Sequence, residues 1–385
     1  MLHRDILVAT FGGVPNKYVG ASTRLFFQYI NGLLHNGHKV IHCVFTTDIV
    51  KAENEVKEYL NQLNNQSVTV HIIDVMSEDS SISMIDELSF DIILCFDITT
   101  AKFFEKYSNK KKILWLGDLQ YLTLYYHYYY YVKGNFFHIF KAPVVFFKII
   151  KQLLEYKKYC RQFDLIIVSS YSSVRRLKLI NIKNKIKYLP YPWLLDKSVD
   201  LMSIDKFKIA TFLFLGTLNA LGSKSAFDFI ANRLYIKLVN KFGKNKFKIL
   251  ISGSGELPIW FKIYAQNKKE LEYVGFVDDL DKLICQCHGA VIPVDVPVGN
   301  RSRIVTCFGL KIPVIAHKNT ALGNPSLKHK YNCYLADNPN DFAQYMYDIY
   351  KKPHDNMVHN AFYSYKYSFD PKYAIDQLMY EIKNI

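Results

Sequence analysis

The chain has 385 residues, which is more than one ordinary hydrophobic core accommodates and which fits two domains of similar size. Its residues are 50% hydrophobic and 22% charged, a composition that excludes a disordered chain. The formal net charge of +15 favours an anionic partner, such as phosphate groups or an acidic membrane surface. A lysine-rich surface without a special role is an equal alternative.

The first half of the chain alternates apolar strands with amphipathic helices. Asp5–Thr10 is a predicted buried strand, and a glycine-containing loop separates it from a helix that begins near Thr23 and ends at Gly37 in a left-handed cap. Ser172 is the predicted N-cap of a later helix. Continuous apolar runs of this kind indicate strands that are buried on both faces of a parallel sheet. The further strands predicted in this half are Val40–Phe45, Val68–Val75, Asp91–Phe96, Lys112–Leu116, Asp164–Ser169 and Ile186–Leu189.

An aromatic and basic stretch without Asp or Glu runs from Leu119 to Leu154. Aromatic rings beside lysines suit the headgroup layer of an anionic membrane, so the stretch predicts a membrane-facing surface. A core helix pair with aromatic packing is the alternative interpretation. The residues predicted to face the membrane are Tyr125, Tyr126, Tyr129, Tyr130, Lys133, Phe136 and Phe137.

A second α/β series follows a break in the pattern. Pro190 and Pro192 end the first series, and the polar, irregular stretch Leu195–Lys208 is the predicted domain boundary. The predicted domains are residues 1–195 and 206–385, with the last helix a candidate to pack back on the first domain. The whole pattern therefore indicates two α/β domains built on parallel sheets. The strands predicted in the second half are Thr211–Leu215, Phe247–Ser252, Glu272–Phe276, Ala290–Val294 and Val314–Ala316.

Four loops of the second domain follow predicted strands at the edge where open parallel sheets bind ligands. The most informative loop is Pro297–Arg303, where free backbone N–H groups, a helix dipole and the two guanidinium groups of Arg301 and Arg303 predict a diphosphate site. A solvated loop with surface arginines is the alternative for one such loop taken alone. Four loops at the same edge favour a binding site.

Several features place the chain inside the cell. No apolar run is long enough to span a bilayer, and the first residues read as a strand rather than a signal peptide. Seven scattered cysteines, an odd number, favour reduced thiols. Nucleic acid is not expected as a partner because the chain has no zinc-finger, RNP-like or basic-helix motif. We therefore expect a cytoplasmic protein that associates peripherally with the inner face of the cell membrane.

The order of these motifs resembles the family 4 glycosyltransferases over nearly the whole chain. Their C-terminal domain is similar to the succession of strand-end motifs in the second half, and their donor-binding helix resembles the segment that begins at Gly299. The first domain resembles the opening and the close of the family's N-terminal domain. The motifs that carry the resemblance are Phe214–Gly216, Ile251–Gly255, Val274–Val277, Val291–Pro293, Gly299–Ile304, Ile312–Ala316, Gly20, Asn36–Val40, Val168–Ser170 and Leu189–Pro190.

The resemblance implies a GT-B fold, in which two Rossmann-like domains face each other across a cleft and the C-terminal one holds a UDP- or GDP-sugar. Gly275–Val277 would lie by the base, while Gly299–Arg303 and Lys224 would hold the diphosphate. Fixed cations and a helix dipole can stabilise the leaving group without a metal, and no Asp-x-Asp pair follows a strand, so neither a metal nor another cofactor is expected. The predicted donor-binding residues are Gly216, Lys224, Gly253, Gly275, Phe276, Val277, Gly299, Asn300, Arg301, Ser302 and Arg303.

One departure from the family pattern concerns two glutamates, separated by seven residues, that flank the donor-binding helix in many members. The corresponding residues here are Val298 and Thr306. The contacts that these glutamates make with the sugar and the ribose must therefore come from other residues, or the donor differs, or activity is lost.

The first domain supplies the acceptor side in this interpretation. Asp118 follows the predicted strand Lys112–Leu116, where a carboxylate could act as a base or orient the acceptor hydroxyl. An Asp that caps the next helix is the alternative. The residues expected to line the acceptor wall are Gly12, Gly13, Ser22, Thr23 and Arg24.

The sequence thus predicts a glycosyltransferase that moves a sugar to a glycan acceptor of the cell surface, such as a lipopolysaccharide or capsule precursor. The membrane-facing stretch predicts an acceptor linked to a polyprenyl or other lipid. Retention of the anomeric configuration is the outcome that the resemblance favours. The alternatives are a sugar-nucleotide epimerase on the same fold and a catalytically inactive GT-B protein that supports a partner transferase.

Overall fold

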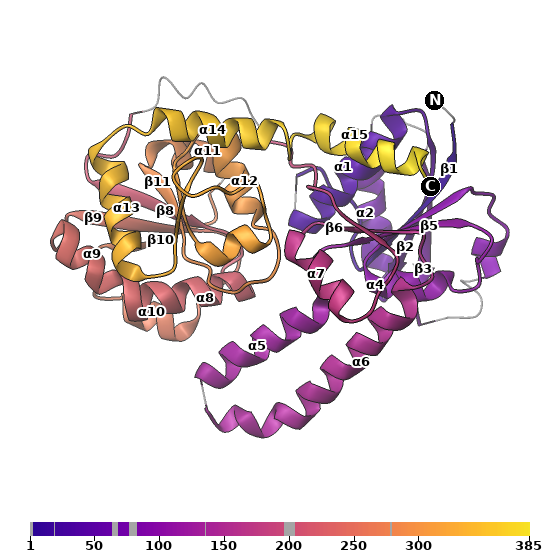
Figure 1. Ribbon diagram of the computed structural model, residues 1–385, viewed down its shortest axis with the longest axis horizontal. Coiled ribbons are helices and arrows are strands. Elements are labelled where there is room, and N and C mark those ends of the chain that lie inside the picture. The colour runs from indigo at the N-terminus through magenta and orange to yellow at the C-terminus, as the bar shows by residue number, and fades with distance from the viewer. Residues whose placement is uncertain are drawn as a thin grey trace. The chain divides into compact units, whose positions relative to one another are not determined.

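The computed structural model of the chain describes residues 3–18, 20–63, 68–76, 83–134, 136–195, 205–277 and 279–385, apart from the side chains of Gly134 and Phe136. The chain divides into two compact units (Figure 1). Unit 1 contains Met1–Tyr121, Phe146–Leu194 and Phe369–Ile385, and unit 2 contains Leu122–Val145 and Leu195–Ser368. Most of the predicted boundary stretch, residues 196–204, lies outside the described residues.

Unit 1 is built on a seven-stranded parallel sheet in the order β3-β2-β1-β4-β5-β6-β7. Its central strands are buried along almost their whole length, because helices cover both faces of such a sheet. The strands are β1 (Asp5–Phe11), β2 (Lys39–Thr46), β3 (Val68–Asp74), β4 (Ile92–Phe96), β5 (Lys111–Leu116), β6 (Leu165–Val168) and β7 (Lys185–Tyr188).

The helices of unit 1 come from three separate parts of the chain. The C-terminal helix α15 contacts α1 so closely that a Cβ atom on Gly32 would lie 2.6 Å from the Cδ1 atom of Ile375. The buried carboxylate of Glu381 on α15 pairs with Lys185 and Lys187 of β7. The helices are α1 (Ala21–His35), α2 (Ile49–Gln62), α4 (Ile98–Ala101), η1 (Lys102–Phe104), α7 (Tyr171–Leu179) and α15 (Pro371–Lys383).

Two helix ends in unit 1 test the predicted caps. Helix α1 ends as predicted, because Gly37 has a φ of 81° and donates to the carbonyl of Leu34, while His38 donates to that of Leu33. The prediction for Ser172 is wrong. Helix α7 begins at Tyr171, so the N-cap is Ser170 and Ser172 lies inside the first turn.

Unit 2 is built on a six-stranded parallel sheet in the order β10-β9-β8-β11-β12-β13. Five of its strands lie where the sequence predicts them, whereas β13 has only three residues and gives too short a pattern to recognise. The strands are β8 (Ala210–Leu215), β9 (Phe247–Ser252), β10 (Leu271–Gly275), β11 (Gly289–Ile292), β12 (Val314–His317) and β13 (Tyr334–Ala336).

The helices around this sheet include one interruption. Between α8 and α9 the backbone passes through a short π-helical turn, η4, a local widening that is frequent at functional sites. The helices are α8 (Leu221–Phe229), η4 (Ile230–Leu234), α9 (Tyr235–Phe242), α10 (Ile259–Ala265), α11 (Leu280–Gln286), α12 (Ser302–Gly309), η5 (Lys318–Leu322), α13 (Pro339–Lys351) and α14 (Asp355–Lys366).

The aromatic stretch folds into α5 (Gln120–Gly134), the 3₁₀ helix η2 (Phe136–Lys141) and α6 (Ala142–Cys160). The α5–η2 turn is fixed by the hydroxyl of Tyr128, which donates to the carbonyls of His138 and Ile139, and by the ring of Tyr131, which stacks on His138 at 3.7 Å. Few side chains of α6 are buried, so most of the stretch is not core.

Within the described part of the chain, no helix is both long and apolar enough to cross a membrane.

Candidate functional site

Both sheets have the same strand order at their centre, and this order places a crevice at a defined point. The chain runs outward in one direction from β8 through β9 to β10, and then in the other direction from β11. The helices that follow β8 and β11 therefore lie on opposite faces, and the gap between them at the carboxyl edge is where such sheets bind ligands. In unit 2 this edge carries the loops that the sequence predicts as donor-binding.

Two glycines allow close packing at this edge. Gly216 follows β8 and Gly253 follows β9, with φ angles of 138° and 152°. A Cβ atom on Gly253 would lie 1.7 Å from the carbonyl oxygen of Gly216, so no other residue fits there. The N–H of Gly216 donates to Ser252, and the N–H of Gly253 donates to Gly275 at the end of β10. These glycines therefore let the ends of β8, β9 and β10 lie close together.

Arg303 is the central cation of this edge. It lies in the first turn of α12, and its guanidinium is positioned over the ring of Phe214 and against Gly216, where an added Cβ atom would be 2.5 Å from Nη2. The Nη1 atom is buried and has no hydrogen-bond partner within the described part of the chain. Burial, followed by the nearby Arg301 guanidinium, lowers the pKa of Arg303 to about 9.

Arg301 lies close to Arg303, and Lys224 lies in the helix that follows β8. The Nη2 atom of Arg301 donates to the carbonyl of Val296 at 2.9 Å, which holds the loop after β11. An added Cβ atom on Gly222 of α8 would be 3.5 Å from the Nη1 atom of Arg301. Lys224 lies in the first turn of α8 and makes no ion pair with any residue that the structure describes. The edge between β8 and β11 is therefore cationic.

The remaining predicted donor residues occupy the loops at this edge. Gly275 ends β10 with a φ of 73°, Phe276 beside it is 75% exposed, and Val277 is half-buried. Gly299 has a φ of 80° and, with Asn300, precedes the N-cap residue Arg301 of α12. Ser302 is the first residue of that helix. The structure thus brings the loops after β8 and β11 together around Arg303.

The two positions of the absent glutamates carry no acidic group. Val298 is buried in the loop before α12. The hydroxyl of Thr306 donates to the backbone carbonyl of Ser302 within the helix, at 3.3 Å.

The predicted acceptor residues lie at the corresponding edge of unit 1. Gly12 follows β1 with a φ of 69° and donates its N–H to Phe45. Gly13 contacts Thr23, and Ser22 is exposed in the first turn of α1. Arg24 donates to the carbonyl of Leu194 at 2.9 Å and lies over the ring of Trp193, so part of its guanidinium is used to hold the end of the first domain. Asp118, two residues after β5, is exposed.

Sequence reasoning missed Asp97, the residue that follows β4 and flanks the crevice of unit 1. Its φ of 87° and ψ of 151° belong to a region that is otherwise almost restricted to glycine. The side chain of Gln120 donates to both carboxylate oxygens, at 2.8 and 2.9 Å, and burial raises the carboxyl pKa. Strain and a perturbed acid at a strand end are typical of functional sites. Its position directly after an apolar strand was the available signal.

Tyr130 and Lys133, both predicted to face the membrane, are instead engaged inside unit 2. The Tyr130 hydroxyl donates to the carboxylate of Asp295, and Lys133 pairs with Asp228 at 2.5 Å. Arg233 of η4 pairs with Asp228 at 3.5 Å and with Asp295 at 3.3 Å. These five side chains form a polar cluster that joins α5 to the rest of unit 2.

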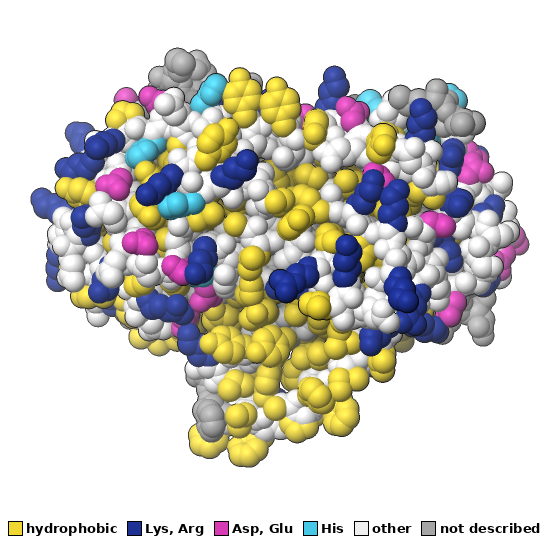
Figure 2. All heavy atoms as spheres, in the orientation of Figure 1, with side chains coloured by type: hydrophobic (Ala, Val, Ile, Leu, Met, Phe, Trp, Pro, Cys, Tyr) yellow, Lys and Arg dark blue, Asp and Glu magenta, His cyan; other side chains and the backbone are white. Residues whose placement is uncertain are grey.

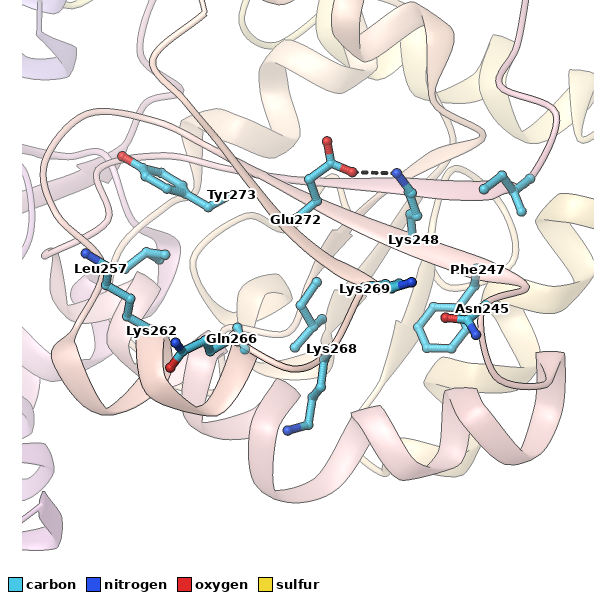
Figure 3. Close-up of a pocket in the computed structure, with 13 residues that line it drawn as sticks. Asn245, Phe247, Lys248, Leu257, Lys262, Gln266, Lys268, Lys269, Glu272 and Tyr273 are labelled. Carbon is cyan, nitrogen blue, oxygen red and sulfur yellow. Dashed lines mark hydrogen bonds and ion pairs between the residues drawn. The ribbon is translucent and has the colours of Figure 1, made fainter.

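A cavity of about 880 Å³ lies elsewhere in unit 2, beside the edge strand β10 (Figure 3). Lys248 and Glu272 point toward each other there and form an ion pair of 2.5 Å. Phe247 and Leu271, which begin β9 and β10, place the cavity by the amino ends of these strands. Its described lining residues include none of the predicted donor positions, so we do not assign the donor to it.

Residues 210–352 match the family model described as Glycosyl transferases group 1. The chain carries a group 1 glycosyltransferase domain. This domain coincides with the sheet of unit 2 and contains Gly216, Arg301 and Arg303. A comparison with curated proteins finds none that matches.

Solved structures with the same architecture cover almost the whole of this glycosyltransferase chain. HepE from Anabaena, in complex with UDP, has a TM-score of 0.69 and 11% identity, over 99% of this chain and all (100%) of HepE. A glycosyltransferase from Rickettsia africae has a TM-score of 0.69 and 12% identity, over 99% and 98% of the two chains. Sucrose-phosphate synthase from Thermosynechococcus elongatus has a TM-score of 0.67 and 11% identity, over 99% of each chain. These findings confirm the predicted GT-B fold.

Proposed function

We propose that this glycosyltransferase moves a sugar from a nucleoside diphosphate to a lipid-linked glycan acceptor in the synthesis of a cell-surface polysaccharide. Unit 2 would hold the donor, and unit 1 would contribute groups to the acceptor hydroxyl. The cytoplasmic face of the membrane would be the place of the reaction.

The observation that carries the proposal is the buried Nη1 atom of Arg303, which has no hydrogen-bond partner among the described residues. A half-buried guanidinium with such an atom costs folding free energy, and a ligand with negative charge would offset that cost. Gly216 leaves room for the Arg303 guanidinium itself, and the N-terminus of α12, which has no side-chain cap among the described residues, adds the positive end of a helix dipole at the same edge. A diphosphate matches both the charge and the geometry of these donors.

Uridine is the base that we favour, with guanosine as the alternative. HepE, which shares the fold, has been crystallised with UDP and with UDP-glucose. Gly275, Phe276 and Val277 are the proposed neighbours of the base, and the exposed ring of Phe276 offers a surface on which it could stack.

The chemistry needs the departing diphosphate to be stabilised as its charge develops. Arg303, Arg301 and Lys224 supply three fixed positive charges at the proposed diphosphate position, so we propose that transfer proceeds without a metal. Asp118 and Asp97, both at strand ends in unit 1, are the candidates to orient or deprotonate the acceptor hydroxyl. We further propose retention of the anomeric configuration, which NMR of the first product formed would test.

The lipid linkage of the acceptor rests on the surface of η2 and the first turns of α6. Hydrophobic side chains gather at the lower end of the view in Figure 2, where these elements lie in Figure 1. Phe137 and Phe140 of η2 are 77% and 80% exposed, and Lys141 and Lys148 are exposed beside them. Rings and lysines of this kind insert into the headgroup layer of anionic membranes.

The donor site is tested by thermal unfolding with UDP, GDP, ADP and CMP. A nucleotide at about 100 times its dissociation constant should stabilise the wild type by roughly 2.7 kcal/mol. The Arg303→Met variant should unfold at the same temperature or higher without ligand, because it removes a half-buried guanidinium whose Nη1 atom has no hydrogen-bond partner among the described residues, and should lose the response to the nucleotide. A response that survives in Arg303→Met would contradict the proposed site.

A catalytically inactive protein that supports a partner transferase is the second candidate function. It is favoured by Val298 and Thr306, since valine accepts no hydrogen bond and the threonine hydroxyl lacks the charge of a carboxylate. The two functions separate when UDP-glucose binding is measured beside sugar transfer to a membrane lipid extract. Binding without any transfer or hydrolysis would favour the inactive protein, and turnover would exclude it.

A further inference from the structure

A second cavity of unit 2, of about 910 Å³, lies between α5 and the loops at the carboxyl edge of the sheet. One set of lining residues comes from α5 and η2 and is mainly aromatic, with Tyr128, Tyr130 and Tyr131. The other set comes from α8, η4, α10 and the loops before α8 and α10, and it includes Asn219 and Trp260. The cavity thus combines flat rings with amide groups.

The wall formed by α5 is held in place by the polar cluster of Tyr130, Lys133, Asp228, Arg233 and Asp295. The carboxylate of Asp228 is largely buried and accepts from Lys133 and from the amide of Asn232, at 2.5 and 2.9 Å. Charge-assisted hydrogen bonds of this kind are strong and directional. The rings of α5 are therefore positioned before any ligand binds, which lowers the entropy cost of binding.

Lys224 connects this cavity to the proposed donor site. It lines the cavity and lies in the first turn of α8, where a Cβ atom on Gly222 would be 3.5 Å from the Nη1 atom of Arg301. His127 lines the cavity as well, and burial, followed by the charge of Lys224, lowers its pKa. The cavity therefore adjoins the position of the donor diphosphate and does not open on a remote surface.

We propose that this cavity binds the oligosaccharide part of the acceptor, next to the sugar that is transferred. The inference rests on the proposed transferase function. Sugar rings present faces of C–H groups that pack on aromatic rings, and their hydroxyls pair with amide and carboxylate groups. The lining offers aromatic rings in Tyr131 and Trp260. It offers amide and carboxylate groups in Asn219, Asn232 and Glu256. A lipid tail would leave these polar groups desolvated without partners.

The experiment is calorimetric titration with soluble oligosaccharides of glucose, galactose, mannose, N-acetylglucosamine and uronic acids, in the absence and presence of UDP. Tyr131→Ala and Trp260→Ala remove rings that are 44% and 46% exposed and line the cavity. Each variant should weaken oligosaccharide binding about tenfold, because a stacking contact of this kind contributes about one factor of ten. UDP binding should not change.

Matched controls remove exposed side chains that do not line the cavity. Tyr363→Ala on α14 removes a ring that is 46% exposed, and Ile259→Ala changes the neighbour of Trp260. Both should bind oligosaccharide like the wild type. Equal weakening in cavity and control variants, or no oligosaccharide binding by a wild type that binds UDP, would overturn the inference. Binding of polyprenyl phosphate alone would also overturn it, in favour of a lipid site. Failure of UDP binding with oligosaccharide binding intact would instead contradict the donor site.

Discussion

Two individual residues lower the folding stability of this chain. The Nη1 atom of Arg303 is buried and has no hydrogen-bond partner among the described residues, and Asp97 combines a strained backbone with a half-buried carboxylate. Each feature costs free energy that a protein selected only for stability would avoid. Both residues lie at the carboxyl edge of a sheet beside a topological crevice, which is why we propose them for the donor and acceptor sides.

His42 carries a pH prediction of the opposite kind, because it serves the core. It is fully buried in β2, with Nε2 3.0 Å from the hydroxyl of Thr10, and burial lowers its pKa from 6.5 to about 3. The unfolded chain takes up a proton below about pH 6.5, whereas the folded chain does not. Stability is therefore complete above that pH and falls toward pH 3, by up to about 1.4 kcal/mol per pH unit for this group.

Urea unfolding at several pH values tests this prediction. Other histidines with lowered pKa values, such as His317, add to the slope of the wild type. The difference between the wild type and His42→Gln isolates the contribution of His42, and the variant should show the flatter dependence below about pH 6.5. Parallel curves would show that the imidazole is protonated in the folded state.

At the scale of elements, the stretch from α5 to α6 has two different faces. One side of α5 faces the rest of unit 2, where Tyr130 contacts Asp295 and Lys133 pairs with Asp228. The η2 turn and the start of α6 leave large apolar side chains exposed, Phe137 and Phe140 among them. The first face fits the proposed acceptor cavity and the second fits the proposed membrane surface. The stretch from α5 to α6 would therefore bring a lipid-linked glycan from the membrane to that cavity.

The membrane surface makes its own prediction. The double variant Phe137→Ser/Phe140→Ser should reduce binding to vesicles rich in anionic lipid by at least about tenfold, because two rings no longer enter the apolar layer. Sedimentation with the vesicles measures the change. Ile236→Ser, which alters an exposed apolar residue of α9, is the matched control and should bind like the wild type. Equal binding by all three proteins would contradict a membrane role for η2.

At the scale of the whole molecule, the chain order does not follow the order of the compact units. The chain leaves unit 1 after Leu194 and returns to it at Phe369, and helix α15 then packs on α1. Ile375 is buried against Gly32, and Glu381 pairs with two lysines of β7. The last seventeen residues, 369–385, are therefore part of the structure of unit 1.

This arrangement predicts that a change in α15 weakens unit 1. Ile375→Asp would place an unpaired charge against α1 and should cost about 3 kcal/mol or more. Hydrogen exchange should show loss of protection in α1 and α15, with the sheet of unit 2 unchanged. Lys372→Asp, on the exposed side of the same helix, is the control and should leave exchange as in the wild type. Protected α1 amides in Ile375→Asp would contradict the prediction.

The sequence by itself determined the strands, the two α/β halves and the glycosyltransferase family of the second half. Continuous apolar runs identify strands buried on both faces, and glycines such as Gly253 and Gly275 mark their ends, because both signals are local in the chain. The cationic loop around Arg301 and Arg303 was visible for the same reason. The three-residue strand β13 was missed because its register depends on β12 rather than on its own pattern.

Tertiary structure alone decided which of these groups meet. Asp97 gains its importance from the backbone conformation at the end of β4 and from Gln120, which lies 23 residues further along the chain. Tyr130 was placed with the membrane residues because composition does not tell the two sides of a helix apart, whereas Asp295 is 165 residues away. Contacts over such distances depend on strand order and helix packing, which no local pattern encodes.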